Sequence, residues 1–309
     1  MSEPIILGID HGYAAMKTAH CCFPTGLVEY AHEPYSMENV LEYEGRYFVV
    51  GSGRQPLQKD KTQTEDYYLL TMAAIAQELA YRQAGPTAEI ILAAGLPLTS
   101  FGRDKKAFRR YLLRDKAPVS FRFAGKAYTV TITDVQLFPQ GYAAVLTQRE
   151  LLEDPSVIVA DIGGWTVDLM RIDNLLPNAA TCRSLELGMI RCLDTISEQI
   201  RRSRDISMTS AQIESALRGS VSNLDSGAKE IIRTEAEKYV SQLLSAIQEC
   251  GLDYRAMPMI LLGGGASLFK SHVPPAVAPC RLFLLDVVTL NAKGFERLCG
   301  QMSGHDGNG

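Results

Sequence analysis

The chain has 309 residues, 46% of them hydrophobic and 21% charged, a globular composition that excludes wholesale disorder and fibrous structure. Its 31 basic and 35 acidic residues give a formal net charge of -4, which argues against nucleic-acid binding through bulk positive charge. No apolar run approaches the roughly 18 residues of a membrane span, and the N-terminus lacks the features of a signal peptide. We therefore expect a protein of about two domains with no membrane partner.

The seven cysteines are odd in number, and none of them forms a Cys-x-x-Cys pair. The five histidines do not fall at zinc-ligand spacing. Most of the cysteines stand in apolar stretches, where a free thiol behaves as a small hydrophobic residue. They predict reduced core positions in a cytoplasmic protein rather than disulfides or a metal site.

Short apolar strands and amphipathic helices alternate through the first half of the chain. We expect strands at residues 5–10, 15–22, 43–51 (a pair), 89–94, 119–123 and 128–132, and helices at 62–82, 105–114 and 141–149. In the first of these helices, Leu69, Met72 and Ala76 share one face. Thr62 and Glu65 at its start have the spacing of a capping box.

The alternation restarts in the second half. We expect strands at residues 157–161, 166–172, 259–262 and 281–286, and helices at 189–202, from 209 onwards, 229–249 and 292–299. Thr209 and Gln212 again have capping-box spacing. Residues 303–309 are rich in glycine and are expected to form a mobile tail. Strands that alternate with helices throughout indicate an α/β protein.

Two segments of the chain repeat one another. Each is an apolar strand that ends in Asp and turns through glycine, at residues 7–12 (LGIDHG) and 158–163 (IVADIG). Without gaps, Asp10 aligns with Asp161, and Lys17 aligns with Asp168. Glycine turns present backbone N–H groups to anions, an Asp at a strand end can hold a cation or its waters, and Lys can reach phosphate oxygens. The repeat therefore predicts a nucleotide-phosphate and magnesium site assembled from two domains.

A third glycine element supports this interpretation. The apolar strand at 259–262 runs into Gly263, Gly264 and Gly265, where the backbone can approach a flat base or ribose. One Asp-x-Gly turn alone is a common structural turn, and a strand that enters a glycine turn can be a tight strand-to-helix connection. The three elements in this order together favour a nucleotide site.

These motifs resemble those of the actin superfamily of nucleotide-binding proteins, and most closely the plasmid-partitioning bacterial actins of the ParM type. The resemblance covers nearly the whole chain. It is carried by residues 9–17 (IDHGYAAMK), 160–168 (ADIGGWTVD), 138–142 (FPQGY), 262–266 (LGGGA), 290–295 (LNAKGF) and 188–189 (GM). It implies an actin-like fold in which two related α/β domains, a duplicated ribonuclease-H-like core, surround a nucleotide cleft.

The resemblance also implies domain boundaries. Domain I would comprise residues 1–141 and 287–309, with the first phosphate loop and the connecting helices. Domain II would comprise residues 142–286, with the second phosphate loop, the adenosine motif and a helical subdomain at about 189–255.

The resemblance assigns roles to the motif residues. Asp10 and Asp161 would position Mg²⁺ and its waters, and Asp161 would also act in catalysis. Gln140, the other catalytic residue, would orient the attacking water. The nucleotide-binding set would be Asp10, Gly12, Tyr13, Lys17, Gly163, Gly164, Gly188, Gly263, Gly264 and Gly265.

Two positions depart from the pattern of the superfamily. Tyr13 stands where many members have a small hydroxyl residue, and Trp165 follows the second glycine pair where threonine is frequent. Tyr13 can face away from the nucleotide while its backbone N–H binds phosphate. Trp165 is expected to pack or to contact another subunit rather than to act in catalysis.

As a function, the resemblance implies a filament-forming ATPase of the bacterial cytoplasm that drives plasmid DNA segregation. Its cofactor would be Mg²⁺ with ATP, and a preference for GTP stays open. Its partners would be further copies of itself and a plasmid-encoded DNA-binding adaptor protein, with no direct nucleic-acid contact.

Other proteins with this fold set the alternatives. A small-molecule kinase that does not polymerise would need a general base, for which Asp168 and Glu186 stay open. Heat-shock chaperones of the superfamily carry a substrate-binding domain that 309 residues do not accommodate. A membrane-tethered actin would need an amphipathic anchor, and residues 300–309 have too few apolar side chains for one.

Overall fold

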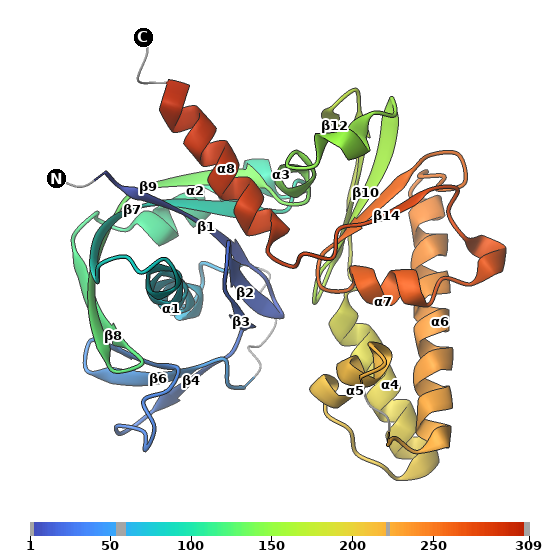
Figure 1. The fold of residues 1–309 in the computed structure, drawn as a ribbon, viewed down its shortest axis with the longest axis horizontal. Coiled ribbons are helices and arrows are strands. Elements are labelled where there is room, and N and C mark those ends of the chain that lie inside the picture. The colour runs from blue at the N-terminus through green and yellow to red at the C-terminus, as the bar shows by residue number, and fades with distance from the viewer. Residues whose placement is uncertain (1–2, 54–59, 221–222, 306–309) are drawn as a thin grey trace. The chain divides into compact units, whose positions relative to one another are not determined.

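The computed structural model describes residues 3–53, 60–220 and 223–305. The chain divides into two compact units (Figure 1): unit 1 comprises Met1–Gln148 and Thr289–Gly309, and unit 2 comprises Arg149–Val288. Each unit combines one sheet with helices, which confirms the predicted α/β class. No helix within the described ranges is long and apolar enough to cross a membrane.

Unit 1 is built on a nine-stranded sheet with the strand order β3-β2-β1-β7-β9-β8-β5-β6-β4. Its strands are β1 (Ile5–His11), β2 (Ala15–Thr18), β3 (Cys22–Pro24), β4 (Leu27–Tyr30), β5 (Val40–Tyr43), β6 (Arg46–Val50), β7 (Thr87–Leu96), β8 (Val119–Phe123) and β9 (Lys126–Pro139). Strands β1, β7 and β9 run parallel, and the other pairs are antiparallel. The carboxyl ends of the three parallel strands therefore share one edge of the sheet, where α/β proteins commonly bind ligands.

The helices of unit 1 are α1 (Asp66–Tyr81), α2 (Phe101–Leu113), α3 (Tyr142–Val145) and α8 (Leu290–His305). The sheet curves around α1 (Figure 1), and most residues of that helix are buried. A helix that is apolar on nearly all sides can be accommodated only inside a core. Helix α1 thus supplies the centre of the unit 1 core, together with Leu7 and Ile9 of β1.

The predicted capping box of α1 is wrong. The helix begins at Asp66, and its N-cap residue Glu65 makes no side-chain cap hydrogen bond. Glu65 instead pairs with Arg46 at 2.8 Å and with Arg114 at 2.7 Å, while the Thr62 hydroxyl bonds to an Asp60 carboxylate oxygen at 2.7 Å. Both side chains that could form the box thus have other partners: Thr62 a residue of its own turn, and Glu65 two arginines from distant segments.

Unit 2 has a five-stranded sheet with the order β12-β11-β10-β13-β14. Its elements are β10 (Ser156–Ile162), β11 (Val167–Asp173), β12 (Leu176–Leu185), α4 (Met189–Arg204), α5 (Ser210–Leu217), α6 (Ser226–Glu249), β13 (Met259–Leu262), α7 (Ala266–Ser271) and β14 (Leu282–Leu284). Single 3-10 turns lie at Arg149–Leu152 and Pro275–Val277. The predicted capping box of Thr209 and Gln212 is confirmed at the start of α5.

Several predicted ends differ from the structure. The expected helix at 141–149 is only the four-residue α3, followed by the 3-10 turn that begins at Arg149. Strand β12 was not predicted, because its sequence does not alternate between apolar and polar residues and half of its residues are exposed. Helix α8 extends to His305, beyond the expected end at 299, and residues 306–309 of the expected tail lie outside the described residues.

The cysteines fit the core prediction only in part. None of the seven forms a disulfide, and only Cys182, Cys192 and Cys299 are buried. Cys22 and Cys280 are exposed: Cys22 begins the short strand β3, and Cys280 lies in a bend before β14.

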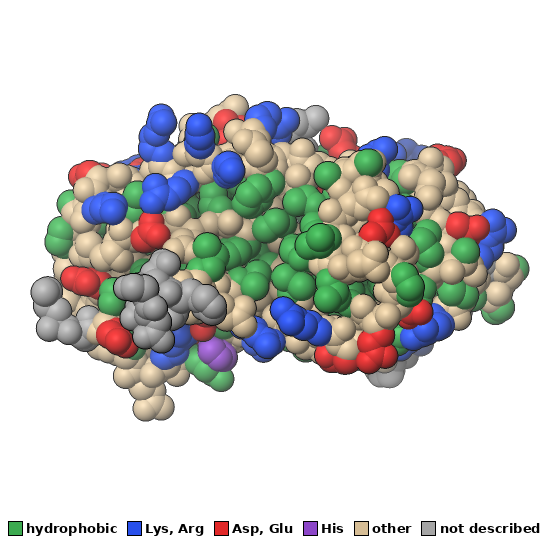
Figure 2. Space-filling model, turned by 90° about the horizontal axis from the view of Figure 1, so that it is seen from above, with side chains coloured by type: hydrophobic (Ala, Val, Ile, Leu, Met, Phe, Trp, Pro, Cys, Tyr) green, Lys and Arg blue, Asp and Glu red, His purple; other side chains and the backbone are tan. Residues whose placement is uncertain are grey.

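On the face shown in Figure 2, basic and acidic side chains are interspersed, in keeping with the small net charge.

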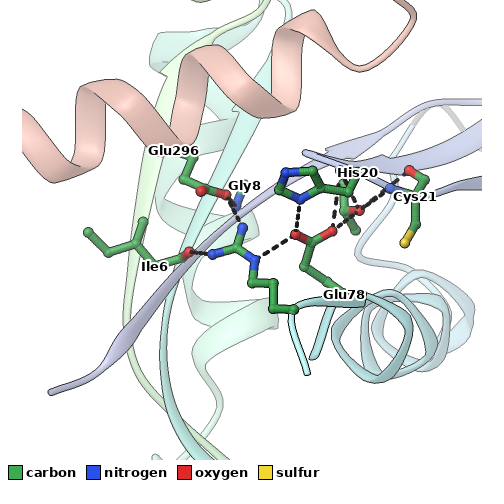
Figure 3. Close-up of polar contacts among 8 residues, drawn as sticks. Ile6, Gly8, His20, Cys21, Glu78 and Glu296 are labelled. Atoms are coloured by element: carbon green, nitrogen blue, oxygen red, sulfur yellow. Dashed lines mark hydrogen bonds and ion pairs between the residues drawn. The ribbon is translucent and has the colours of Figure 1, made fainter. Parts of the chain in front are cut away.

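The buried carboxylate of Glu78 links α1 to the end of β2 and, through Arg82, to α8 (Figure 3). Glu78 of α1 has no exposed side-chain surface and accepts from His20 Nδ1 at 2.6 Å, from Arg82 Nε at 2.7 Å and from the Thr18 hydroxyl. Arg82 also binds Glu296 of α8 at 2.7 Å. Burial alone would raise the pKa of Glu78, but the hydrogen bonds from Thr18, His20 and Arg82 outweigh it and hold that pKa below its ordinary value. A buried charge is stable only with such partners.

A second buried titratable group stands at the end of β1. The His11 ring is fully buried, packs edge-on against Phe108 at 5.2 Å, and shares a 2.9 Å hydrogen bond between its Nε2 and the Thr71 hydroxyl oxygen. Burial, reinforced by the positive charge of Lys61, lowers the pKa of His11 to about 3. The folded protein therefore keeps this ring neutral at any pH near neutrality.

We predict that Glu78→Gln lowers the free energy of unfolding by about 3 kcal/mol, near the lower end of the cost of breaking a buried ion pair, because Arg82 keeps Glu296. Urea denaturation followed by circular dichroism measures this. The matched control is Glu296→Gln, whose partly exposed carboxylate should cost no more than about 1 kcal/mol. Equal losses in the free energy of unfolding for the two variants would show that the burial of Glu78 does not increase its contribution to stability.

We predict that His11 makes the protein less stable as the pH falls from 6.5 towards 3. In that window the unfolded chain binds a proton at His11 and the folded protein does not, so this residue costs up to about 1.4 kcal/mol per pH unit. Urea denaturation at pH 7, 6 and 5 should show a shallower pH dependence for His11→Gln than for the wild type. Parallel curves would mean that His11 does not titrate differently in the two states.

Candidate functional site

The candidate site of unit 1 is centred on Asp10, near the carboxyl end of β1. The β1–β2 pairing places Asp10 directly opposite Lys17, and Lys17 Nζ lies 3.2 Å from Asp10 Oδ2. Gln140 Nε2 donates to the other carboxylate oxygen, Oδ1, at 2.9 Å. Asp10 and Gln140 are buried, with 3% and 8% exposure. Three of the predicted site residues thus meet at one carboxylate.

The register of the parallel strands explains how Gln140 reaches Asp10. Strand β7 pairs with β1 on one side and with β9 on the other, and Gln140 directly follows β9. Its backbone N–H donates to the Leu96 carbonyl at 2.9 Å, and the N–H of Gly141 donates to Asn291 Oδ1 of α8 at 2.8 Å. Both backbone bonds fix the start of the Gln140 side chain. Because its amide donates to Asp10, its carbonyl oxygen is the atom that can accept from a water.

The turn after β1 requires glycine at position 12. A Cβ on Gly12 would lie 2.5 Å from the Ala15 carbonyl oxygen, closer than van der Waals contact allows. The Gly12 carbonyl accepts from the buried Thr25 hydroxyl at 2.7 Å, and the Thr25 N–H donates to the Ala14 carbonyl at 2.9 Å. Thr25 was missed by sequence reasoning, since it belongs to no motif. A side chain from the β3–β4 connection therefore holds the turn.

Unit 2 repeats this hairpin with different chemistry. Asp161 lies opposite Asp168 in the β10–β11 pairing, where unit 1 has Asp10 opposite Lys17. The carbonyl groups of the following glycines are tied to the start of α4: Met189 N–H donates to Gly163 at 3.0 Å and Ile190 N–H donates to Gly164 at 2.9 Å. The second turn is therefore positioned by a helix N-terminus.

Gly188 lies within the same arrangement. Its N–H donates to the Trp165 carbonyl at 2.8 Å, and a Cβ on it would stand 2.5 Å from the Gly164 carbonyl oxygen. Trp165 is partly exposed, and its expected role in packing or subunit contact stays a prediction.

The third glycine element packs onto the same strand end. Strand β13 pairs in parallel with β10, with Leu262 opposite Asp161. Gly263 has φ +86°, and a Cβ there would lie 2.5 Å from Asp161 Oδ1; a Cβ on Gly265 would lie 2.4 Å from Ile162 Cγ2. An added Cβ on Gly264 meets no atom within 4 Å. Gly263 and Gly265 are thus required by packing inside unit 2, and only Gly264 has an open outer side.

The predicted metal residues are placed one in each unit. Both oxygens of Asp10 already bind side chains of unit 1, and no group of three or more His, Cys, Asp or Glu side chains in the described ranges could hold a metal ion. Asp161 is buried, with 9% exposure. Such carboxylates suit a Mg²⁺ ion that keeps its own waters better than a cage of direct ligands.

The chain was compared with protein families and with known proteins. A model described as the N-terminal domain of actin-like proteins matches residues 8–142, and a model of the archaeal actin homologue MreB-like C-terminal domain matches residues 159–274. Together the two models span most of the chain. No curated protein matches.

Solved structures with the same fold are distant in sequence. The archaeal actin homologue Ta0583 in complex with ADP has a TM-score of 0.78 at 20% identity, over 96% of this chain and 99% of that one. A 15-stranded ParM filament from Clostridium botulinum has a TM-score of 0.75 at 19% identity (97% and 100%), and Bacillus thuringiensis ParM with ATP has 0.71 at 14% (97% and 100%). The two family models and the shared fold identify the chain as a member of the actin-like superfamily.

Proposed function

We propose that this protein is a nucleotide-dependent, filament-forming actin that hydrolyses ATP. The observation that carries the proposal is the buried contact of Asp10 with both Lys17 and Gln140. This contact holds two groups at one carboxylate: the Lys17 ammonium, which can bind phosphate oxygens, and the Gln140 amide, which can bind a water molecule. Similar structures include one with ADP, one with ATP and one filament, which supports the nucleotide and the polymer together.

In the proposed reaction, each residue of unit 1 has one task. Lys17 binds the β- and γ-phosphates as a point charge. The carbonyl oxygen of Gln140 accepts a hydrogen bond from the attacking water and orients it in line with the γ-phosphate. It does not remove a proton from that water, because an amide does not titrate near neutral pH. The backbone N–H groups of Gly12 and Tyr13 bind phosphate oxygens.

In unit 2, the turn at Gly163 and Gly164 is proposed to bind phosphate, and the loop at Gly264 to lie against the base or ribose. Asp10 and Asp161 would hold the waters of Mg²⁺, which when bound neutralises developing charge on the phosphates. The catalytic effect is then positioning and charge stabilisation rather than covalent chemistry.

The cellular role in the proposal is plasmid DNA segregation in the bacterial cytoplasm, through a DNA-binding adaptor protein that links the filament to its cargo. The support for this role is the resemblance of the motifs to the ParM type. The net charge of -4 favours a link through an adaptor over direct contact with DNA. ATP is the proposed nucleotide, and GTP is the alternative to be compared with it.

The direct test is sedimentation of the purified protein with Mg²⁺ and ATP or GTP, with phosphate release measured in the same sample. The proposal expects pelleted polymer only with nucleotide, together with phosphate release that needs no acceptor. A protein that stays in the supernatant and consumes ATP only when a hydroxyl acceptor is added would be a small-molecule kinase of this fold. A protein that neither pellets nor binds nucleotide would overturn the proposal.

A prediction separates the glycines of the third element. Gly264→Val should leave the free energy of unfolding within about 0.5 kcal/mol of the wild type, because a Cβ at this position meets no protein atom within 4 Å. If the nucleotide lies against this backbone, the variant should bind ATP at least about 10-fold more weakly. Fluorescence titration with a labelled ATP analogue and urea denaturation measure the two effects.

The matched control is Gly265→Ala, whose new Cβ would collide with Ile162 and Met189. Overpacking of this kind should cost about 1–3 kcal/mol of stability. An unchanged affinity of Gly264→Val for ATP would remove the loop from the nucleotide site.

A further inference from the structure

Lys61 is a charged residue that no motif contains and that contacts the first glycine turn. It lies in the segment before α1, and its Nζ donates to the His11 carbonyl oxygen. The same ammonium lies 4.7 Å from the centre of the Tyr13 ring and 5.3 Å from that of Tyr67. One cation therefore joins the end of β1, the turn and α1.

The contact to His11 acts on the backbone of the turn. In a planar trans peptide, the carbonyl and the N–H of the next residue point in opposite directions. The bond from Lys61 to the His11 carbonyl thus sets the direction of the Gly12 N–H. The bond from Thr25 to the Gly12 carbonyl, at 2.7 Å, sets the direction of the Tyr13 N–H in the same way.

The ring of Tyr13 is the second group of the turn that Lys61 contacts. A cation over an aromatic face contributes about 0.5–2 kcal/mol, more where the pair is withdrawn from water. Lys61 and Tyr13 are both partly buried. This pairing gives a physical reason for a tyrosine at position 13, since a small hydroxyl side chain offers no ring for the ammonium.

We propose that Lys61 is a positioning residue that aims the backbone N–H groups of Gly12 and Tyr13 at the phosphates of the nucleotide, by holding the His11 carbonyl and the Tyr13 ring. This inference rests on the proposed nucleotide site. It extends that site to a lysine outside the motifs, and it makes the tyrosine a working part of the phosphate loop.

The test compares the affinities of ATP and adenosine, because only ATP has the β- and γ-phosphates that the turn is proposed to bind. Lys61→Met removes the charge and keeps most of the side-chain length. We expect it to weaken ATP binding at least 10-fold and to change adenosine binding less than 2-fold. Lys61→Arg, which keeps a cation and N–H donors, should recover ATP binding to within about 3-fold of the wild type. The matched control for loss of one charge is Lys106→Met, on the exposed face of α2, which should change neither affinity.

A pair of substitutions at Tyr13 tests the ring itself. Tyr13→Phe keeps the aromatic face and should bind ATP more tightly than Tyr13→Leu, which removes the ring. The affinity of the double variant Lys61→Met, Tyr13→Leu for ATP should lie within about 2-fold of that of the weaker single variant. Both substitutions break the same contact, between the Lys61 ammonium and the Tyr13 ring. If Lys61→Met does not fold, the two Tyr13 variants decide alone.

The outcomes separate this inference from the proposed function. A wild-type protein that binds neither ATP nor GTP overturns the proposed function. A wild type that binds ATP, with Lys61→Met binding it equally well, overturns the positioning role. Equal losses for ATP and adenosine also overturn it, because they show a general structural role.

Discussion

The buried carboxylate of Asp10 is the interaction on which the candidate site of unit 1 depends. A carboxylate this deep is stable only when both oxygens have partners, and here the partners are Lys17 and Gln140. Lys17 is placed by the register of the β1–β2 hairpin, and Gln140 by the parallel alignment of β1, β7 and β9. The stability of the strand end and the placement of the two polar groups therefore have one physical cause.

The two halves of the chain use the same hairpin for different purposes. In unit 1 the residue opposite the strand-end Asp is the cation Lys17, and side chains such as Thr25 hold the turn. In unit 2 the opposite residue is Asp168, and backbone bonds to α4 hold the turn. Unit 2 also packs its third glycine element directly against Asp161. The internal repeat has thus kept the geometry of the strand and turn, while the charges around it differ.

The parts of the fold that follow from local patterns could be predicted from the sequence. The apolar run that ends at Asp10, the glycine turns and the capping box of Thr209 are all encoded within a few residues. Contacts between distant segments could not be predicted in this way. Thr25 acts on the site from the β3–β4 connection and Lys61 from the segment before α1, and no spacing rule relates them to residues 9–17. The capping box expected at Thr62 failed for the same reason, because Glu65 is taken by arginines from β6 and the end of α2.

The proposed function requires Asp10 and Gln140 to act as one unit in ATP hydrolysis, and a double-mutant cycle on phosphate release measures whether they do. The rates of Asp10→Asn, Gln140→Ala and the double variant would be measured at saturating ATP, with nucleotide binding confirmed for each. We expect a 10- to 1000-fold loss for each single variant, in the range of a lost transition-state contact, and no further loss in the double variant. Losses that multiply in the double variant, or single variants with the wild-type rate, would contradict it.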